Sequence, residues 1–330
     1  MKNTIKEVAK QAGVSISTVS RVFNNTAFVD EPTKAKVLLA AKELHYTPNQ
    51  AARSLTKSET RTIGLILPGI FGEYFSEVLR GMDAVASDAD FDIMISGAKG
   101  ITTKFEKSIR AMAGRVDGLI IMSPILQGAQ LRELIPVNIP TVLLNSDEEH
   151  PDFDTVNINN SEGAYLAVNH LIRLGHRRIA LIKGSENTYD SQQRTEGYRK
   201  AIRANGLDQY RVEVSGSFTK SSGYDAAREL LAQDERPTAI FAANDAMALG
   251  AMSALQEHGI AVPNTIAVVG FDDIPMSQYS NPKLTTIRVD LKHFGRYAME
   301  RVLVAVRDRS THKVEHTMIN VELVVRSSCH

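Results

Sequence analysis

The sequence predicts an α/β protein in which a small helical head precedes a core of two lobes, each built on a parallel sheet. Near the amino end, two short helical segments meet at Gly13. From residue 62 onward, apolar runs typical of buried strands alternate with helical stretches, and the alternation restarts after residues 174–176. This alternation is typical of parallel sheets covered by crossover helices. Because 330 residues exceed one ordinary core, we expect two or three domains.

Residues 4–22, T-I-K-E-V-A-K-Q-A-G-V-S-I-S-T-V-S-R-V, predict two short helices joined by a tight turn. Thr4 can cap the first helix, and Glu7 three positions later completes a capping box. Gly13 offers the left-handed conformation that the turn needs, and Ser15 can cap the second helix. The second helix would bury Val19, Val22 and Phe23 and leave five residues outward: Ile16, Ser17, Thr18, Ser20 and Arg21. Two such helices are typical of a DNA-reading helix-turn-helix, although an ordinary helical hairpin has the same periodicity.

A third amphipathic helix is predicted over residues 31–44, with Pro32 in its first turn. Its apolar positions are Ala35, Val37, Leu38, Ala41 and Leu44. The following segment 49–57, N-Q-A-A-R-S-L-T-K, is short, basic and rich in small residues. So short a segment does not hold a helix alone in water, and we interpret it as a linker that becomes helical only when packed.

Charge is divided unevenly between the head and the rest of the chain. Residues 1–57 hold nine Lys or Arg and four Asp or Glu, whereas the whole chain holds 38 of each sign. The head therefore carries a formal charge of +5 and the remaining residues carry −5. Since phosphate neutralisation supplies the sequence-independent part of DNA affinity, this asymmetry favours a polyanion bound by the head. A solvated charge run would explain the charge but not the helical motif.

The predicted core strands are continuous Val, Ile and Leu runs, and we therefore expect them to be covered on both faces. They comprise residues 62–68, 91–96, 117–122, 141–145, 178–182, 238–242 and 266–271. The helices predicted between them include residues 73–88, 191–205, 221–233 and 246–258. Two successive α/β units of similar size suggest two lobes with a cleft between them.

Candidate ligand contacts are polar or aromatic side chains just past strand ends, where open parallel sheets bind their ligands. Asn145, Asn244 and Asp272 follow apolar strands, and Arg194 opens a helix after another strand. A polyhydroxylated ligand needs fixed donors and acceptors, which an Asp, an Arg and an Asn supply, together with an aromatic wall. The wall has two candidates: Phe75 and Phe218. The alternative for any Asn or Asp after a strand is a helix cap or a turn.

Motifs for catalysis and metal binding find little support. The adjacent Asp272 and Asp273 are expected to point apart, and no third group completes an acid–base site. His312 and His316 have metal-ligand spacing only in a helix, whereas residues 311–315 look like a turn entering a strand, so we expect surface histidines. Neither a phosphate-binding loop nor a nucleophile elbow is present. We expect no enzymatic activity, no cofactor and no bound metal.

Cysteine content and hydropathy point to a cytoplasmic protein without membrane contact. Cys329 is the only cysteine, which excludes an intrachain disulfide and a Cys-based metal cage. No apolar run approaches the ~18 residues of a membrane span, and the polar amino end does not look like a signal peptide.

Several stretches of the head and core match, in order, those of a known family. They are the segment 4–22 quoted above, Y-T-P-N, N-Q-A-A-R-S-L, L-G-H-R-R-I-A-L-I, R-T-E-G-Y, P-T-A-I-F-A-A-N-D, V-V-G-F-D-D and L-T-T-I-R. The chain thus resembles the lactose/galactose repressor family of bacterial transcription regulators. The resemblance implies a helix-turn-helix head (1–48), a hinge helix and linker (49–60), and a bilobal periplasmic-binding-protein-like core with two parallel sheets. Lobe one would comprise residues 61–160 and 289–320, and lobe two residues 161–288 and 321–330.

The resemblance also implies roles for single residues. The effector contacts would be Phe75, Asn145, Arg194, Phe218, Asn244 and Asp272. In the head we expect Ile16, Ser17 and Arg21 nearest base edges, with four residues mostly on phosphates: Thr4, Ser15, Thr18 and Asn24. The hinge contacts would be Asn49, Ala52, Arg53 and Leu55. Two Leu55 side chains of a homodimer would enter the minor groove of a palindromic operator as apolar wedges; the alternative is that Leu55 packs on its own core.

Two classes of function fit these patterns. The first is a ligand-gated transcription factor, most simply a repressor. The second is a transport-type ligand-binding protein, which would need a signal peptide and no basic head. A sugar or sugar derivative is the leading effector and a purine the alternative, because Phe75 and Phe218 can stack on either. Gly69 and Gly72 stand where the family typically has Asp or Asn, which argues against a simple hexose or pentose. The sequence leaves open whether the effector loosens or tightens DNA binding.

Overall fold

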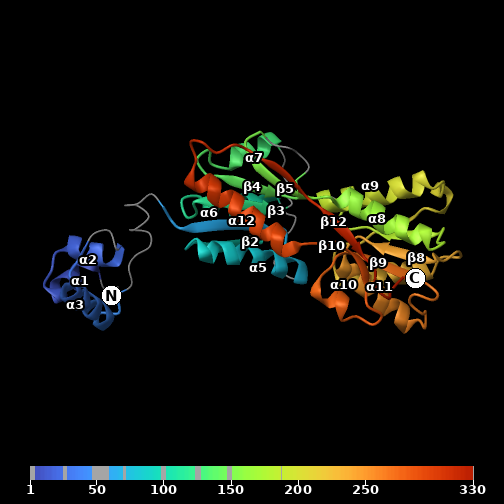
Figure 1. Cartoon of the computed structure of the whole chain (residues 1–330), viewed down its shortest axis with the longest axis horizontal. Helices are drawn as coiled ribbons and strands as arrows, with labels where there is room; N and C mark the ends of the chain where they lie inside the picture. The colour runs from blue at the N-terminus through green and yellow to red at the C-terminus, as the bar shows by residue number, and fades with distance from the viewer. Residues whose placement is uncertain are drawn as a thin grey trace. The chain divides into compact units, whose positions relative to one another are not determined.

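The computed structural model describes residues 4–24, 28–46, 59–69, 72–97, 102–122, 128–146, 151–186 and 188–329. The chain forms two compact units, the head (Met1–Thr60) and the core (Arg61–His330); the helices and strands are labelled in Figure 1. The predicted hinge contacts Asn49, Ala52, Arg53 and Leu55 lie outside the described residues. None of the helices in the described ranges is long and apolar enough to cross a membrane.

In its described residues, the head contains the helices α1 (Ile5–Ala12), α2 (Ile16–Asn24) and α3 (Glu31–Glu43). The predicted capping box is present, because the backbone N–H of Thr4 donates to Oε2 of Glu7 at 2.6 Å. Gly13 adopts a left-handed φ of 66°, and Oγ of Ser15 accepts the backbone N–H of Thr18 at 3.1 Å. The turn between α1 and α2 is therefore formed by the residues that the sequence indicated.

The core of the head is small and consists of Val8, Ala9, Val19, Val37, Ala40 and Ala41. Val22 and Phe23 pack against it while only partly buried. The predictions for Ala35 and Leu38 are wrong, since both residues are exposed, Leu38 over 46% of its surface. Leu38 lies about 100° around the helix from Val37, outside the stripe that Ala40 and Ala41 continue. Asp30, which the sequence analysis did not single out, caps α3 by accepting the Thr33 N–H at 3.2 Å.

Two six-stranded sheets form the core and confirm the predicted α/β fold class. Sheet A has the order β11-β5-β4-β3-β1-β2, and all its neighbouring strands are parallel. Its strands are β1 (Thr62–Leu67), β2 (Asp92–Gly97), β3 (Gly118–Met122), β4 (Thr141–Leu144), β5 (Asp154–Ile158) and β11 (His316–Ile319). Coverage on both faces is wrong for β2, which is half exposed because it forms the edge of the sheet.

Sheet B has the order β12-β10-β9-β8-β6-β7. Its neighbours are parallel except for the antiparallel pair β10 and β12. Its strands are β6 (Ile179–Ile182), β7 (Val212–Val214), β8 (Ala239–Ala242), β9 (Ala267–Asp272), β10 (Thr285–Val289) and β12 (Val321–Val324). We call sheet A with its helices lobe one and sheet B with its helices lobe two.

Helices cover both faces of each sheet (Figure 1). In lobe one, α5 (Glu73–Asp88) and α12 (Leu291–Arg307) lie on one face, with α6 (Thr102–Met112) on the other and α7 (Gly128–Leu134) packed beside α6. In lobe two, α8 (Asn160–Arg173) and α9 (Tyr189–Ala204) lie on one face, and α10 (Lys220–Leu231) and α11 (Asp245–Glu257) on the other. The short 3₁₀ turns are η1 (Asp208–Tyr210) and η2 (Pro275–Gln278).

Glycines bring paired helices into backbone contact. A Cβ atom on Gly81 of α5 would meet the carbonyl oxygen of Lys292, and one on Gly295 of α12 would meet that of Val78. Gly223 and Gly250 make the equivalent contact between α10 and α11. Each of these helix pairs is therefore packed more closely than any larger side chain would permit.

The chain passes between the lobes at three places. β5 of sheet A leads into α8 on sheet B, β10 of sheet B leads into α12 on sheet A, and β11 of sheet A leads directly into β12 of sheet B. The lobes therefore meet at the carboxyl ends of several strands from each sheet.

Candidate functional site

Helix α2 carries five of the seven predicted DNA contacts that lie in the described residues. Ile16 is 44% exposed, and Ser17 and Arg21 are also exposed. Thr18 and Asn24 are half-buried, and Oγ of Ser15 lies 2.7 Å from Oγ of Ser17 and 2.8 Å from Oγ1 of Thr18. The helix thus presents one aliphatic group, several hydroxyls and a guanidinium. These groups suit the methyl groups, acceptors and phosphates of a DNA groove.

A cavity of about 340 Å³ lies between the two lobes. Lobe one contributes the loop after β1 and the first turn of α5, and lobe two contributes the loops after β6, β7, β8 and β9. Five of the six predicted ligand contacts line the cavity: Phe75, Arg194, Phe218, Asn244 and Asp272. The sixth, Asn145, lies directly behind Tyr74, whose side chain also lines it.

Arg194 is almost completely buried, with only 3% of its side chain exposed. Its Nε donates to Oδ1 of Asn160 at 2.8 Å, and its Nη1 donates to the Ala243 carbonyl at 2.5 Å. The guanidinium carbon lies 3.7 Å from the ring centroid of Phe271, a close cation–π contact. Because α9 begins at Tyr189, Arg194 lies in the second turn and does not open the helix; this detail of the prediction is wrong.

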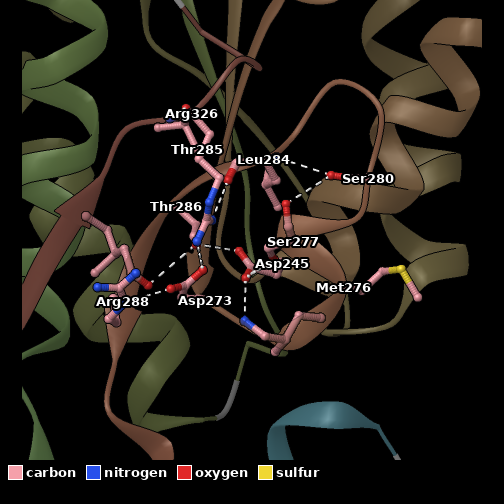
Figure 2. Close-up of polar contacts among 12 residues, drawn as sticks. Asp245, Asp273, Met276, Ser277, Ser280, Leu284, Thr285, Thr286, Arg288 and Arg326 are labelled. Atoms are coloured by element: carbon pink, nitrogen blue, oxygen red, sulfur yellow. Dashed lines mark hydrogen bonds and ion pairs between the residues drawn. The ribbon is translucent and has the colours of Figure 1, made fainter.

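Asp272 ends β9 and faces Arg194, with its Oδ1 3.1 Å from Nη1. Burial raises the pKa of Asp272 to about 8, although the positive charge of Arg194 opposes the shift. Asp273 points away, because its carboxylate accepts from Arg288 Nε at 2.7 Å and from Arg326 Nη2 at 2.6 Å (Figure 2). The two adjacent carboxylates therefore do point apart.

Asn244 acts as a helix cap while also lining the cavity. Its Oδ1 accepts the Met247 N–H at 3.0 Å at the start of α11, and its Nδ2 donates to the carbonyl of Phe218 at 3.2 Å. The alternative given for an Asn after a strand, that it caps a helix, therefore holds for Asn244. Its second bond fixes the loop that carries Phe218.

Asp190, which the sequence analysis did not single out, joins the lobes beneath the cavity. Its Oδ2 accepts from Nδ2 of Asn145 in lobe one at 3.1 Å, and its Oδ1 accepts from Nδ2 of Asn160 at 2.8 Å. Burial raises the pKa of Asp190, with Arg194 opposing the shift. Nothing in the sequence separates this Asp from an ordinary acidic residue in the first turn of a helix.

One acceptor atom beside the cavity, Oδ1 of Asn145, is left without a hydrogen-bond donor among the described residues, and Oδ1 of Asp272 has only its ion pair with Arg194. Asn145, Phe218 and Asp272 also have positive φ angles of 51°, 60° and 111°. Such backbone strain in non-glycine residues is concentrated at ligand sites. Since buried polar atoms are nearly always paired, the open acceptor of Asn145 points to a ligand that donates a hydrogen bond.

Asp245 anchors the segment after β9, in which Ile274 lines the cavity; contacts of Asp245 are drawn in Figure 2. It is fully buried and accepts from the Ile274 N–H at 2.9 Å, the Ser277 hydroxyl at 2.6 Å and the Thr286 hydroxyl at 2.5 Å. Next to this anchored segment, the Met276 N–H donates to Oε2 of Glu73 in lobe one at 2.8 Å. Asp245 thereby holds in place a contact that spans the cleft.

The described residues contain no group of three or more potential metal ligands. His316 enters β11 after a turn, as predicted. The expectation of a free surface side chain is wrong for His312, because its Nε2 lies 2.7 Å from Oδ2 of the buried Asp154 and is mostly covered. The same Asp154 accepts from Arg301 at 2.6 Å, so this cluster is an ion-pair network within lobe one.

Comparisons with known proteins agree with this architecture. Residues 4–49 match the bacterial regulatory proteins of the lacI family, and residues 168–329 match a periplasmic binding protein-like domain. The HTH-type transcriptional repressor PurR of Vibrio atlanticus is 37% identical over 329 residues, covering 98% of each chain. The chain belongs to the lacI family of bacterial regulatory proteins. This confirms the resemblance drawn from the sequence.

Other lacI-family proteins support the same assignment. The probable HTH-type transcriptional repressor ExuR of Bacillus subtilis is 37% identical over 331 residues, again covering 98% of each chain. The Lac repressor dimer bound to operator and an anti-inducer has a TM-score of 0.86 and 30% identity over 99% of each chain. As a lacI-family protein, the chain is a DNA-binding transcriptional regulator with an effector-binding core, and it is not an enzyme.

Proposed function

We propose that the cavity between the lobes binds a hydroxyl-rich effector, a sugar or sugar derivative, and that its occupancy controls operator affinity. The acceptors beside the cavity carry this proposal: Oδ1 of Asn145 has no donor among the described residues and Oδ1 of Asp272 is met only by Arg194, so both can accept from a hydroxyl-rich ligand. Phe75 and Phe218 supply the apolar surface on which a pyranose or furanose face packs. A family protein from Enterococcus faecium with bound ribose (28% identity, TM-score 0.75) and a CelR–cellobiose complex (29%, 0.73) support this ligand class.

A purine-like effector is the second candidate, and the aromatic lining favours it. Tyr74 and Phe75 stand edge to face with ring centroids 5.3 Å apart, which fixes the orientation of the Phe75 ring. A fixed ring on each side of the cavity, Phe75 from lobe one and Phe218 from lobe two, suits a flat heterocycle. A sugar would therefore place a pyranose or furanose ring between Phe75 and Phe218, and a purine would place a flat heterocycle there.

A thermal-shift screen of the full-length protein with sugars, sugar derivatives, purine bases and nucleosides tests the effector class. We expect one sugar-type compound to raise Tm by several degrees and to change operator affinity in a gel-shift titration. Phe218→Ala should lower the affinity for that compound. Phe91→Ala, which removes a half-buried ring outside the cavity, should leave the affinity unchanged. Stabilisation by purines alone would reject the sugar proposal in favour of the second candidate.

We propose further that a homodimer reads a palindromic operator, with α2 of each head in a major groove. Ile16, Ser17 and Arg21 would face base edges, and Thr4, Ser15, Thr18 and Asn24 would mostly contact phosphates. The exposure of Ile16 and Arg21 on one helix supports this assignment. For the hinge contacts Asn49, Ala52, Arg53 and Leu55, we propose folding on DNA with Leu55 as the minor-groove wedge.

Arg21→Ala is expected to lower the preference for operator over random DNA by roughly 5- to 150-fold, because a forked contact to guanine gives about 1–3 kcal/mol of discrimination. Fluorescence anisotropy with operator and scrambled duplexes at one salt concentration measures this ratio. Lys42→Ala, which removes an exposed charge from α3, should lower the affinity for both duplexes equally and leave the ratio of the two affinities unchanged. An unchanged ratio in Arg21→Ala would remove Arg21 from base readout.

A further inference from the structure

We propose that the cavity rejects anionic ligands, so that the effector is a neutral or amine-bearing compound and not a carboxylate or a phosphate ester. This inference rests on the proposal that the cavity binds the effector. The inference excludes the acidic members of both candidate effector classes, because sugars and purines both occur in cells with and without acidic groups. Three observations carry it: the charges that line the cavity, the helix ends that point at it, and the engagement of its cation.

The ionisable residues lining the cavity are mostly acidic. Glu73, Asp190 and Asp272 face it, and Arg194 is the one Lys, Arg or His among its described lining residues. Burial raises the pKa of both Asp190 and Asp272. Protonation of both would still leave the guanidinium balanced by Glu73, so the described lining has no surplus of positive charge in any of these states.

Four helices begin at the cavity, an arrangement that in most α/β proteins attracts anions. Here the first turns of three of them already carry a carboxylate: Glu73 in α5, Asp190 in α9 and Asp245 in α11. The fourth, α10, is capped by the side chain of Thr219, which accepts the Ser222 N–H at 3.2 Å. Carboxyl groups of the protein therefore already stand at three of the four helix ends that a ligand phosphate or carboxylate would use.

Two of the three guanidinium nitrogens of Arg194 are already engaged by protein groups. Its Nε and Nη1 donate to Asn160 and to the Ala243 carbonyl, and it is paired with Asp272. A ligand carboxylate at Arg194 would compete with Asp272 inside a cleft that also holds Asp190. One uncompensated negative charge in such a site lowers affinity by about 100-fold.

The decisive experiment compares matched compounds by calorimetry on the full-length protein. The sets are galactose, galactosamine, galacturonate and galactose 6-phosphate; ribose and ribose 5-phosphate; and adenosine and its 5′-monophosphate. We expect every binder to be neutral or amine-bearing, with its acidic counterpart at least about 100-fold weaker. Tighter binding of a carboxylate or phosphate than of its neutral counterpart would overturn the inference. If no compound in these sets binds, the same comparison is made with the compound found by the thermal-shift screen and its acidic counterpart, and failure of that whole screen would reject the proposed effector class on which the inference rests.

Charge-neutralising variants test the assignment to particular residues. Glu73→Gln keeps an oxygen that can accept the Met276 N–H but removes the charge, and Asp190→Asn preserves size. Each should lower the discrimination against the acidic counterpart by at least about tenfold. Glu162→Gln is the matched control, because Glu162 lies in the first turn of α8 but not along the cavity. Discrimination that is unchanged in both cavity variants, or lowered equally in the control, would contradict the role of Glu73 and Asp190.

Discussion

Replacing Arg194 with methionine is expected to abolish the response to effector and to lower the free energy of unfolding by about 3–5 kcal/mol. Arg194 is the cation beside two buried carboxylates, Asp190 and Asp272, and its removal leaves both uncompensated. Its guanidinium also holds Asn160 and the Ala243 carbonyl, so the loops of lobe two lose their common anchor. Urea unfolding near neutral pH measures the stability, and operator binding with and without effector measures the response.

Arg199→Met provides the matched control on the same helix. Arg199 forms two hydrogen bonds with Glu213, at 2.8 and 2.7 Å, but 39% of its side chain is exposed. Exposed ion pairs contribute at most about 1 kcal/mol, so this variant should stay close to the wild type and respond to effector. Equal losses in the two variants would show that Arg194 acts as an ordinary helix-surface charge.

Asp245→Asn is expected to flatten the dependence of stability on pH. Burial raises the pKa of Asp245 to about 7, and its hydrogen bonds from Ser277, Thr286 and Ile274 only partly oppose this shift. The folded protein therefore keeps a proton that the unfolded chain, with a pKa of about 3.9, has already lost. The stability from this group is fully present below about pH 3.9 and is lost as pH rises through about 7, amounting to about 2 kcal/mol between about pH 5.5 and about pH 8.

The asparagine side chain can occupy the same position with little rearrangement. Its oxygen can accept from Ile274 and Ser277, while its amide donates to Thr286 Oγ1, whose hydroxyl can turn toward the carbonyl of Ile287. Urea unfolding at several pH values should show a profile about 2 kcal/mol flatter than that of the wild type. Asp225→Asn, at an exposed position on α10, is the control and should retain the wild-type slope. An identical slope in Asp245→Asn would mean that Asp245 is already ionised in the folded protein.

Much of the fold could be predicted because its central strands are apolar on both faces. The helix over residues 73–88 was predicted with the bounds of α5, and the strand boundaries agree within about two residues. β5 was missed although it is wholly buried, because its sequence D-T-V-N-I is half polar. Its polar groups are paired with distant residues: Asp154 with Arg301, and Asn157 with the backbone of Ser146. Such pairing depends on tertiary structure and leaves no local signal.

The candidate site was likewise predictable only where local sequence placed its residues. Asp272 and Asn244 follow apolar strands, so their places at the sheet edge could be predicted from position alone. Asp190, Asn160 and Tyr74 belong to three different helices, and only the packing of the lobes brings them together. The acidic character of the cavity was therefore not evident from the sequence, because its acidic residues are far apart along the chain.

The glycine contacts between paired helices bear on how a ligand signal can travel. Where two backbones touch at Gly81 and Gly295, or at Gly223 and Gly250, one helix has no side-chain layer on which to slide past the other. This close packing disfavours shear between α5 and α12 and between α10 and α11. We therefore expect the change on ligand binding to be concentrated in rotation at the three chain segments that join the lobes. A bulky residue at one of these glycines would separate its helix pair and weaken the coupling between the cavity and the head.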